Sequence, residues 1–158
     1  MIKQQESDKT ATAWNNYQRM RVRLSGRLNR ELSRETGLSE ADYDILAHLS
    51  SAPDESVRAL ALRCGLEWEK SRLSHQIRRM EQRGLLVREE CLEDNRGTVI
   101  RISNEGRKLA ELGKRHHEEA VKRYVLDVLT PGQLDALGTI AETILAHVEV
   151  SDDTQRHL

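Results

Sequence analysis

Apolar side chains recur every three or four residues along most of the chain, and this spacing predicts a series of helices. A long first helix is expected from about Asp8 to Glu35, and Gly37 suits the left-handed position that follows a helix end. Ser39, with Asp42 three residues later, is typical of a capped helix start. The second helix therefore begins there, and Pro53 ends it.

Two further helices and a tight turn are predicted next. A short helix is expected over Ser56 to Cys64, with Leu60 and Leu62 pointing inward. Gly65-Leu66 then forms the turn, and a longer helix covers Glu67 to Arg83. A helix, a short glycine turn and a helix form the helix-turn-helix arrangement.

The period of the apolar pattern then changes from helical to alternating. Leu85 to Glu89 and Thr98 to Ile102 are predicted to be short strands, joined by the charged loop Glu90 to Gly97. Ser103 caps a helix that reaches about Leu129, and Pro131 starts a last helix that reaches about Val150. The expected fold is therefore mainly α with a small β-hairpin, in one domain over residues 1–158.

Composition supports a helix-rich protein and excludes several classes. The chain has 37% hydrophobic residues, 32% charged residues, two prolines and a net charge of −1, so its overall charge does not decide for or against nucleic acid. It has no apolar run long enough for a membrane span, and its polar N-terminus is unlike a signal peptide. It also has no phosphate-binding glycine loop or nucleophile motif. We therefore expect a non-enzymatic cytoplasmic protein without a cofactor.

The helix over Glu67 to Arg83 carries the candidate chemistry. On a helical wheel Leu73, Ile77 and Met80 form one stripe, which we expect to face the core. The opposite face carries hydroxyl, imidazole and guanidinium groups and no carboxylate, and such groups donate hydrogen bonds to phosphates and base edges. Its members are Ser71, His75, Arg78 and Gln82, flanked by Arg72, Arg79 and Ser74.

Local charge supports this interpretation without deciding it. Residues 70–88 contain six Lys or Arg residues against one acid, Glu81. The first helix has the same excess over Arg19 to Arg34, where six arginines stand against Glu31. A basic, solvated helix face therefore remains an alternative to a DNA-binding face.

The order of elements is that of a winged helix: a helix-turn-helix followed directly by a hairpin with an arginine near its tip. Four local patterns, in this order and at these distances, resemble the MarR family of transcriptional regulators over nearly the whole chain. They are Ser71-Arg72-Leu73-Ser74, residues 79–85 (RMEQRGL), Asp94-Asn95-Arg96-Gly97, and residues 102–106 (ISNEG).

The resemblance implies an obligate homodimer that binds double-stranded DNA at a pseudo-palindromic operator. Residues 39–103 would form the DNA-binding lobe, and residues 8–36 and 104–150 the dimerisation helices. The apolar stripes of the terminal helices, from Leu109 to Leu129 and from Leu134 to Val148, exceed what one small winged-helix domain covers, so an extensive subunit interface is expected.

Residue roles follow from the resemblance by position. Arg96 corresponds to the arginine at the wing tip, while Asp94 and Arg79 look like members of a polar network that positions the wing. Asp94 is alternatively a simple turn residue. His75 stands where the family often has arginine. The full set of expected DNA contacts is Lys70, Ser71, Arg72, Ser74, His75, Arg78, Arg79 and Arg96.

The resemblance also implies an effector cavity between the dimerisation helices and the DNA-binding lobe, for a phenolic or other lipophilic anion. The candidate lining is Trp14, Tyr17, His48, Trp68 and Arg72. Core packing is an equal alternative for each of these residues, and it is the favoured interpretation for His48 and Trp68.

Two other clusters are weaker candidates. His116 and Glu119 share a helix face, but a solvated face is favoured over a metal site, so no metal is expected. Cys64 and Cys91 flank the DNA-reading elements and could form a redox switch, while a buried apolar role is the alternative for Cys64.

The predicted function is a homodimeric, sequence-specific repressor released by a small effector. Alternatives are a winged-helix DNA-binding protein without small-molecule input, one with a cysteine switch, and a helical dimerisation module that binds an acidic protein.

Overall fold

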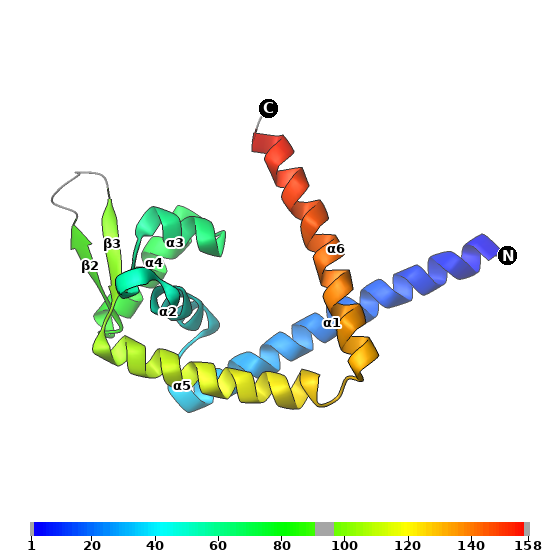
Figure 1. Ribbon diagram of the computed structural model, residues 1–158, viewed down its shortest axis with the longest axis horizontal. Coiled ribbons are helices and arrows are strands. Elements are labelled where there is room, and N and C mark those ends of the chain that lie inside the picture. Colours follow the sequence, from blue (N-terminus) through cyan, green and yellow to red (C-terminus); the bar gives the residue numbers. More distant parts are fainter. Residues whose placement is uncertain (1, 91–96, 157–158) are drawn as a thin grey trace. The chain divides into compact units, whose positions relative to one another are not determined.

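The structure is a computed structural model, and it describes residues 2–90 and 97–156 (Figure 1). Its helical elements are α1 (Ile2–Thr36), α2 (Glu40–Ser51), the 3-10 turn η1 (Pro53–Glu55), α3 (Ala59–Leu66), α4 (Lys70–Gln82), α5 (Asn104–Val121), the π-helical turn η2 (Lys122–Leu126) and α6 (Pro131–Arg156). Its strands are β1 (Ser56–Arg58), β2 (Leu86–Glu90) and β3 (Thr98–Ile102). The chain divides into two compact units, residues 1–120 and 121–158.

Local signals set the ends of several helices as predicted. The Ser39 hydroxyl accepts a hydrogen bond from the Asp42 backbone N–H at 3.1 Å, and the Asp42 carboxylate accepts one from the Ser39 backbone N–H at 2.9 Å. Gly37 and Gly84 follow α1 and α4 with φ of 70° and 72°, a conformation that favours glycine. Ser103 precedes α5, and its hydroxyl accepts a hydrogen bond from the Gly106 backbone N–H at 3.0 Å.

The predicted short helix over Ser56 to Cys64 is wrong at its start. Residues 56–58 form strand β1, which pairs antiparallel with β3 and places Val57 opposite Ile100. The sheet is therefore three-stranded, in the order β1-β3-β2, rather than a two-stranded hairpin. Three residues are too few to show the alternation of a strand, so only the partner strand makes the element recognisable.

The turn between α3 and α4 also differs from the prediction. α3 continues through Gly65 to Leu66, and the left-handed residue is Glu67, with φ of 54°. α4 consequently begins at Lys70 rather than at Glu67. Leu62 is fully buried as expected, whereas the side chain of Leu60 is 64% exposed, so its predicted inward position is wrong.

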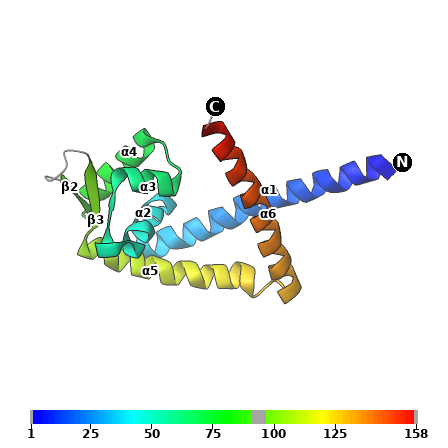
Figure 2. The same ribbon diagram turned by 45° about the horizontal axis from the view of Figure 1, so that its top comes forward.

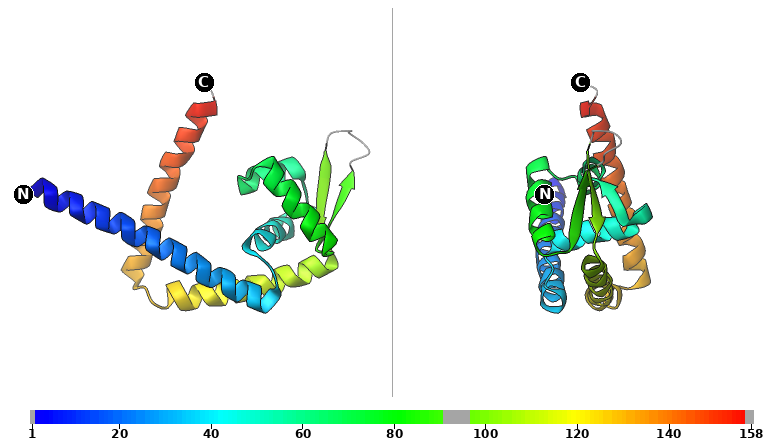
Figure 3. Two further views of the ribbon diagram at one scale, coloured as in Figure 1. Left: turned by 180° about the vertical axis from the view of Figure 1, so that it is seen from behind. Right: turned by 90° about the vertical axis from the view of Figure 1, so that its left-hand side faces the viewer.

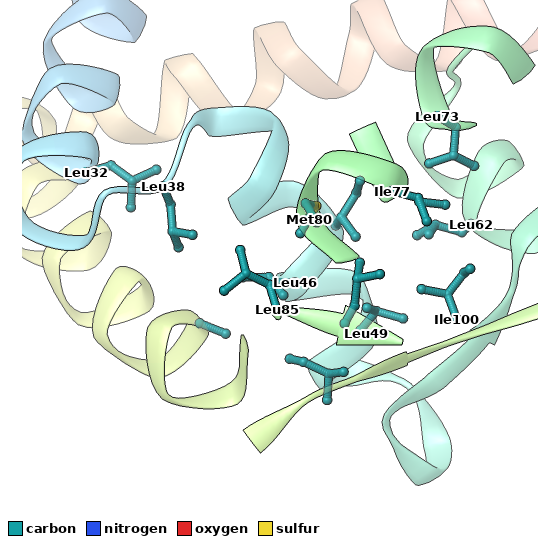
Figure 4. Close-up of a cluster of buried hydrophobic side chains, with 14 residues drawn as sticks. Leu32, Leu38, Leu46, Leu49, Leu62, Leu73, Ile77, Met80, Leu85 and Ile100 are labelled. Carbon is teal, nitrogen blue, oxygen red and sulfur yellow. The ribbon is translucent and has the colours of Figure 1, made fainter. Parts of the chain in front are cut away.

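One hydrophobic core holds the first unit together (Figure 4). α2, α3 and α4 pack on one another and on the sheet, and the C-terminal part of α1 runs beside α5 (Figures 2 and 3). At that crossing Gly113 of α5 lies against Leu32 and Tyr43. The core members are Leu32, Leu38, Ile45, Leu46, Leu49, Leu62, Leu73, Ile77, Met80, Leu85, Leu86, Ile100, Ile102 and Ala110.

The second unit begins at Val121 and consists of η2 and α6. α5 ends at Val121, earlier than the predicted Leu129, and the π-helical turn follows it. Lys122 Nζ lies 2.8 Å from the Asp127 carboxylate and closes this turn. α6 starts with Pro131 at its first position, as predicted, and most of its large apolar side chains are exposed in the single chain. No helix in the described residues is long and apolar enough to cross a membrane.

Candidate nucleic-acid interface

Helix α4 presents the predicted polar face to solvent. Leu73, Ile77 and Met80 are buried in the core, which orients the rest of the helix. All expected contact residues of this helix are exposed; they are Lys70, Ser71, Arg72, Ser74, His75, Arg78 and Arg79. Arg96 lies outside the described residues. The helix therefore carries a continuous outward face of hydrogen-bond donors without a carboxylate.

The basic side chains near this face fall into two groups. Within the described residues, the side chains of Lys70, Arg78 and Arg79 make no hydrogen bond or ion pair. By contrast, Arg83 Nη1 lies 2.7 Å from the Asp42 carboxylate, and Arg88 Nη2 lies 2.6 Å from that of Glu81. The charge excess counted along the sequence is thus partly neutralised, and the unpaired charge concentrates on α4.

Arg72 is held by an aromatic partner. Its guanidinium carbon lies 4.0 Å from the centroid of the Trp68 ring, which is the geometry of a cation–π contact. Trp68 is half-buried and packs against the core, in agreement with its predicted packing role. Since Arg72 is exposed and its side chain makes no hydrogen bond within the described residues, its N–H groups stay free to bind a base or a phosphate.

A buried polar network, which the sequence analysis missed, attaches α4 to α2 and to the end of α1. Asp42 is 1% exposed, and its carboxylate accepts hydrogen bonds from Gln76 Nε2 at 2.6 Å and from Arg83 Nη1 at 2.7 Å. Arg83 Nη2 also donates to the Gly37 carbonyl oxygen at 3.1 Å. Gln76 occupies the same helix face as Leu73 and Ile77, and a polar residue on that stripe was the available signal.

The Asp42 carboxyl is charged in the folded protein. Burial by itself raises its pKa, but hydrogen bonds from Arg83 and from the Ser39 backbone and hydroxyl outweigh burial and hold the pKa below the usual 3.8. Folding lowers the pKa of this carboxyl, so the charged carboxylate stabilises the folded state at any pH above the pKa of the unfolded chain. This stabilisation is lost as the pH falls from the unfolded pKa through the lower folded pKa.

Asp42→Asn should destabilise the protein by about 2 kcal/mol at pH 7, because it removes a charge that several buried donors share. Below about pH 4 the difference between variant and parent should shrink, since the unfolded parent then binds a proton at Asp42 while the folded parent binds it only at still lower pH. Urea unfolding at pH 7 and pH 3 measures both effects. Glu81→Gln, which removes an exposed ion pair with Arg88, should cost less. Equal stability of Asp42→Asn and the parent at pH 7 would contradict the role of this network.

The base of the hairpin is tied to its surroundings by arginines. Arg88 of β2 donates from Nε and Nη2 to Glu81 of α4 at 2.9 and 2.6 Å. Arg101 of β3 donates from Nε to Glu89 at 3.0 Å and from Nη1 to the Asp54 carbonyl oxygen at 2.8 Å. These contacts fix the direction in which the hairpin leaves the core.

Arg79, the described member of the predicted wing-positioning pair, takes no part in this arrangement. Arg79 is exposed and makes no hydrogen bond within the described residues, so its assignment to a network with Asp94 gains no support. Asp94 itself, like Arg96 and Cys91, lies outside the described residues. The arginines that hold the hairpin are Arg88 and Arg101.

The described cavities do not bring together the five residues predicted to line an effector pocket. Trp14 is exposed on α1, with its ring centroid 5.4 Å from that of Tyr17. Trp68 and Arg72 pair with each other at α4. His48 is exposed rather than a core histidine, and its Nδ1 lies 3.2 Å from the Asp44 carbonyl oxygen. Sequence spacing does not show which helices meet, and the described part of the structure lends this grouping no support.

A different cavity, of about 330 Å³, lies between α1, α2 and α5, and Tyr17 is its one residue from the predicted set. Its walls are mostly aliphatic and aromatic, with a few charged groups. The lining consists of Tyr17, Met20, Arg21, Leu24, Ser25, Leu28, Asn29, Leu32, Glu40, Tyr43, Asp44 and His117.

The remaining candidates are isolated side chains. Cys64 is exposed with a free thiol, so the alternative of a buried apolar role is wrong. His116 Nδ1 lies 4.0 Å from Glu119 Oε2, as expected for residues on one helix face. Among the described residues, no three potential metal ligands gather into a site.

Comparison with known proteins gives concordant matches. A model of the MarR family matches residues 36–97. An uncharacterised HTH-type transcriptional regulator of Bacillus subtilis (strain 168), YdgJ, is 26% identical over 93 residues, which are 59% of this chain and 56% of that protein.

Two solved structures from Streptomyces coelicolor are similar over most of the chain. The MarR family transcriptional regulator Sco3205, solved in complex with DNA, is 31% identical with a TM-score of 0.80, over 85% of this chain and 84% of its own. AbsC, also a MarR family transcriptional regulator, is 32% identical with a TM-score of 0.83, over 90% of this chain and 95% of its own.

Proposed function

The chain belongs to the MarR family of transcriptional regulators, and we propose that it is a homodimeric repressor that a small lipophilic effector releases from a pseudo-palindromic operator. The observation that carries this proposal is the outward face of α4. It combines exposed hydroxyl, imidazole and guanidinium donors with cations that have no acidic partner among the described residues. Such a face suits a major groove, where base edges and phosphates accept hydrogen bonds.

Within this face we assign two roles. Arg72, which lies over the Trp68 ring, reads a base edge with its paired N–H groups, as arginine does at guanine. Lys70, Arg78 and Arg79 supply contacts to the phosphate backbone, which position the helix. Arg96 is assigned to the minor groove or adjacent phosphates by its place in the family pattern.

The second unit supports the proposed dimer. An isolated helix with a long exposed apolar face is unfavourable in water, and a second copy of the chain covers such a face by two-fold symmetry. Two recognition helices related by a two-fold axis then read half-sites about one helical turn, roughly 34–36 Å, apart. Release by an effector requires that the ligand bind a DNA-incompetent arrangement better than a competent one.

The salt dependence of operator binding tests the DNA-binding role. Each phosphate neutralised by Lys or Arg should make the slope of log K against log salt more negative by about 0.9. Each α4 has four cationic side chains, so the two α4 helices of a dimer should give a slope of up to about −7. Fluorescence anisotropy on duplexes from the flanks of the protein's own gene measures this slope between about 50 and 200 mM salt. A flat response would contradict DNA binding and favour an acidic protein partner.

Two variants refine this test. Arg78→Ala should reduce the magnitude of the slope by about 1 per subunit if Arg78 contacts a phosphate. Arg72→Ala should instead weaken discrimination between operator and altered duplexes by about 1–3 kcal/mol. Arg23→Ala, which removes an exposed arginine from the equally basic helix α1, is the matched control and should change neither quantity.

A further inference from the structure

The cavity between α1, α2 and α5 has an apolar body. Met20, Leu24 and Leu28 of α1 form one wall, and the aromatic rings of Tyr17 and Tyr43 contribute to the lining. A cavity of about 330 Å³ with walls of this kind holds a small lipophilic molecule and leaves its polar group to be matched by the few charged side chains present.

The charged side chain of interest in this lining is Asp44. It is half-buried, and its carboxylate makes no hydrogen bond or ion pair within the described residues. Burial chiefly, and then the neighbouring Glu40, raise the pKa of Asp44 above its usual value. His48, Arg72 and His117 act in the opposite direction but do not compensate.

Three other polar groups of the lining have partners of their own. Glu40 accepts a hydrogen bond from Asn29 Nδ2 at 2.8 Å. Arg21, the arginine in the lining, is exposed, and its Nε donates to Gln18 at 3.2 Å. The His117 ring lies 5.6 Å from the ring of Tyr43. Asp44 is therefore the acidic side chain of the lining that makes neither a hydrogen bond nor an ion pair within the described residues.

We propose that this cavity binds a lipophilic organic cation, an amine carried on an aromatic or alkyl group. The ammonium pairs with Asp44, and the rings of Tyr17 and Tyr43 offer their negative faces to the same charge. A lipophilic anion, the class that the family resemblance implied, would instead meet two carboxylates, those of Asp44 and Glu40. The inference rests on the proposed effector response and names the class of its ligand.

Three ligands of nearly equal size and shape test the charge preference: 4-phenylbutylamine, 4-phenylbutanol and 4-phenylbutyrate. Isothermal titration at pH 7 with the full-length protein should give at least tenfold tighter binding of the amine than of the alcohol, with the acid weakest. Asp44→Asn should reduce amine affinity at least tenfold and leave alcohol affinity unchanged, because the amide keeps the shape and removes the charge.

Glu105→Gln is the matched control. Glu105 is an exposed acid at the start of α5 and is not part of the cavity lining, so its variant should bind all three ligands as the parent does. Thermal melting without ligand shows that both variants are folded, and Asp44→Asn should melt no lower than the parent since it relieves a half-buried unpaired charge.

The outcomes separate this inference from the proposed function. Tightest binding of the acid overturns the ligand class and leaves effector release in place. Binding of none of the three at millimolar concentration, or amine binding that Asp44→Asn leaves unchanged, overturns the assignment of the cavity. Amine binding that depends on Asp44 but leaves operator affinity unchanged supports the ligand class and overturns effector release. DNA binding is judged independently by the salt slope.

Discussion

Replacing Leu137 and Ile144 together by glutamate should convert the protein into a monomer. Both side chains lie on one face of α6, seven residues apart, and they are 42% and 51% exposed in the single chain. The face continues through other large aliphatic side chains, namely Leu134, Ile140, Leu145 and Val148. A stripe of this length is expected to be covered by the same face of a second subunit.

The expected effect is large because two-fold symmetry doubles it. Full burial of one large aliphatic side chain contributes about 1.5–3 kcal/mol, so burying the exposed half of each one contributes about 0.7–1.5 kcal/mol, and a dimer contains four of the replaced side chains. Lost burial then costs at least about 3 kcal/mol, which raises the dimer dissociation constant by roughly 10²-fold or more, and burial of the introduced carboxylates adds to this cost. A monomer binds one half-site, so operator affinity should fall by about 10²–10⁴-fold.

Sedimentation velocity at micromolar concentration and operator binding measure the two effects. The matched control is Thr139→Glu with Ala146→Glu, which adds the same charges at the same spacing on the opposite side of α6. This control should remain dimeric and should bind operator normally. If the Leu137 and Ile144 variant sediments as a dimer, α6 does not form the subunit interface.

Gly106→Ala should destabilise the first unit severely, by about 3 kcal/mol or more. A Cβ at this position would stand 2.0 Å from the carbonyl oxygen of Leu85 and 3.0 Å from its carbonyl carbon and from Ile102. That oxygen already accepts the Ser103 backbone N–H at 3.1 Å, and the Ser103 hydroxyl donates to the Gly84 carbonyl at 2.6 Å. These two hydrogen bonds fix the backbone of Gly84 and Leu85, which therefore cannot move away from the new Cβ. To make room, α5 would have to move away from the sheet.

Urea unfolding followed by circular dichroism measures this loss. Gly26→Ala is the matched control because its new Cβ would approach only the flexible end of Arg30, at 3.4 Å. Alanine is the better helix former, so this control should be neutral or more stable by up to about 1 kcal/mol. An unfolding free energy for Gly106→Ala within 1 kcal/mol of the parent value would refute the close approach of α5 to Leu85.

Features that depend on neighbouring residues could be predicted from the sequence. The Ser39 and Asp42 cap, the glycines that follow α1 and α4, and the proline that begins α6 all act within one helical turn. The outward face of α4 follows equally from the 3.6-residue period once Leu73 and Ile77 are placed in the core. Gly106 belongs to a motif visible in the sequence. A side chain is excluded there because the backbone of Leu85, about twenty residues earlier, lies against it.

Features that depend on distant partners could not be predicted. Strand β1 is too short to show a period, and it becomes a strand by pairing with β3, more than forty residues later. Asp42 reaches Gln76 and Arg83 across 34 and 41 residues.

The sequence by itself determined the main helices and the two strands of the hairpin, the family pattern and the polar face of α4, because these arise from local spacing and side-chain chemistry. Only the tertiary structure decided which arginines are neutralised and which side chains share a cavity. Arg83 and Arg88 find acids on other elements, whereas Arg78 and Arg79 find none among the described residues. Charge pairing and cavity lining are properties of distance in space, which the order of residues along a chain does not contain.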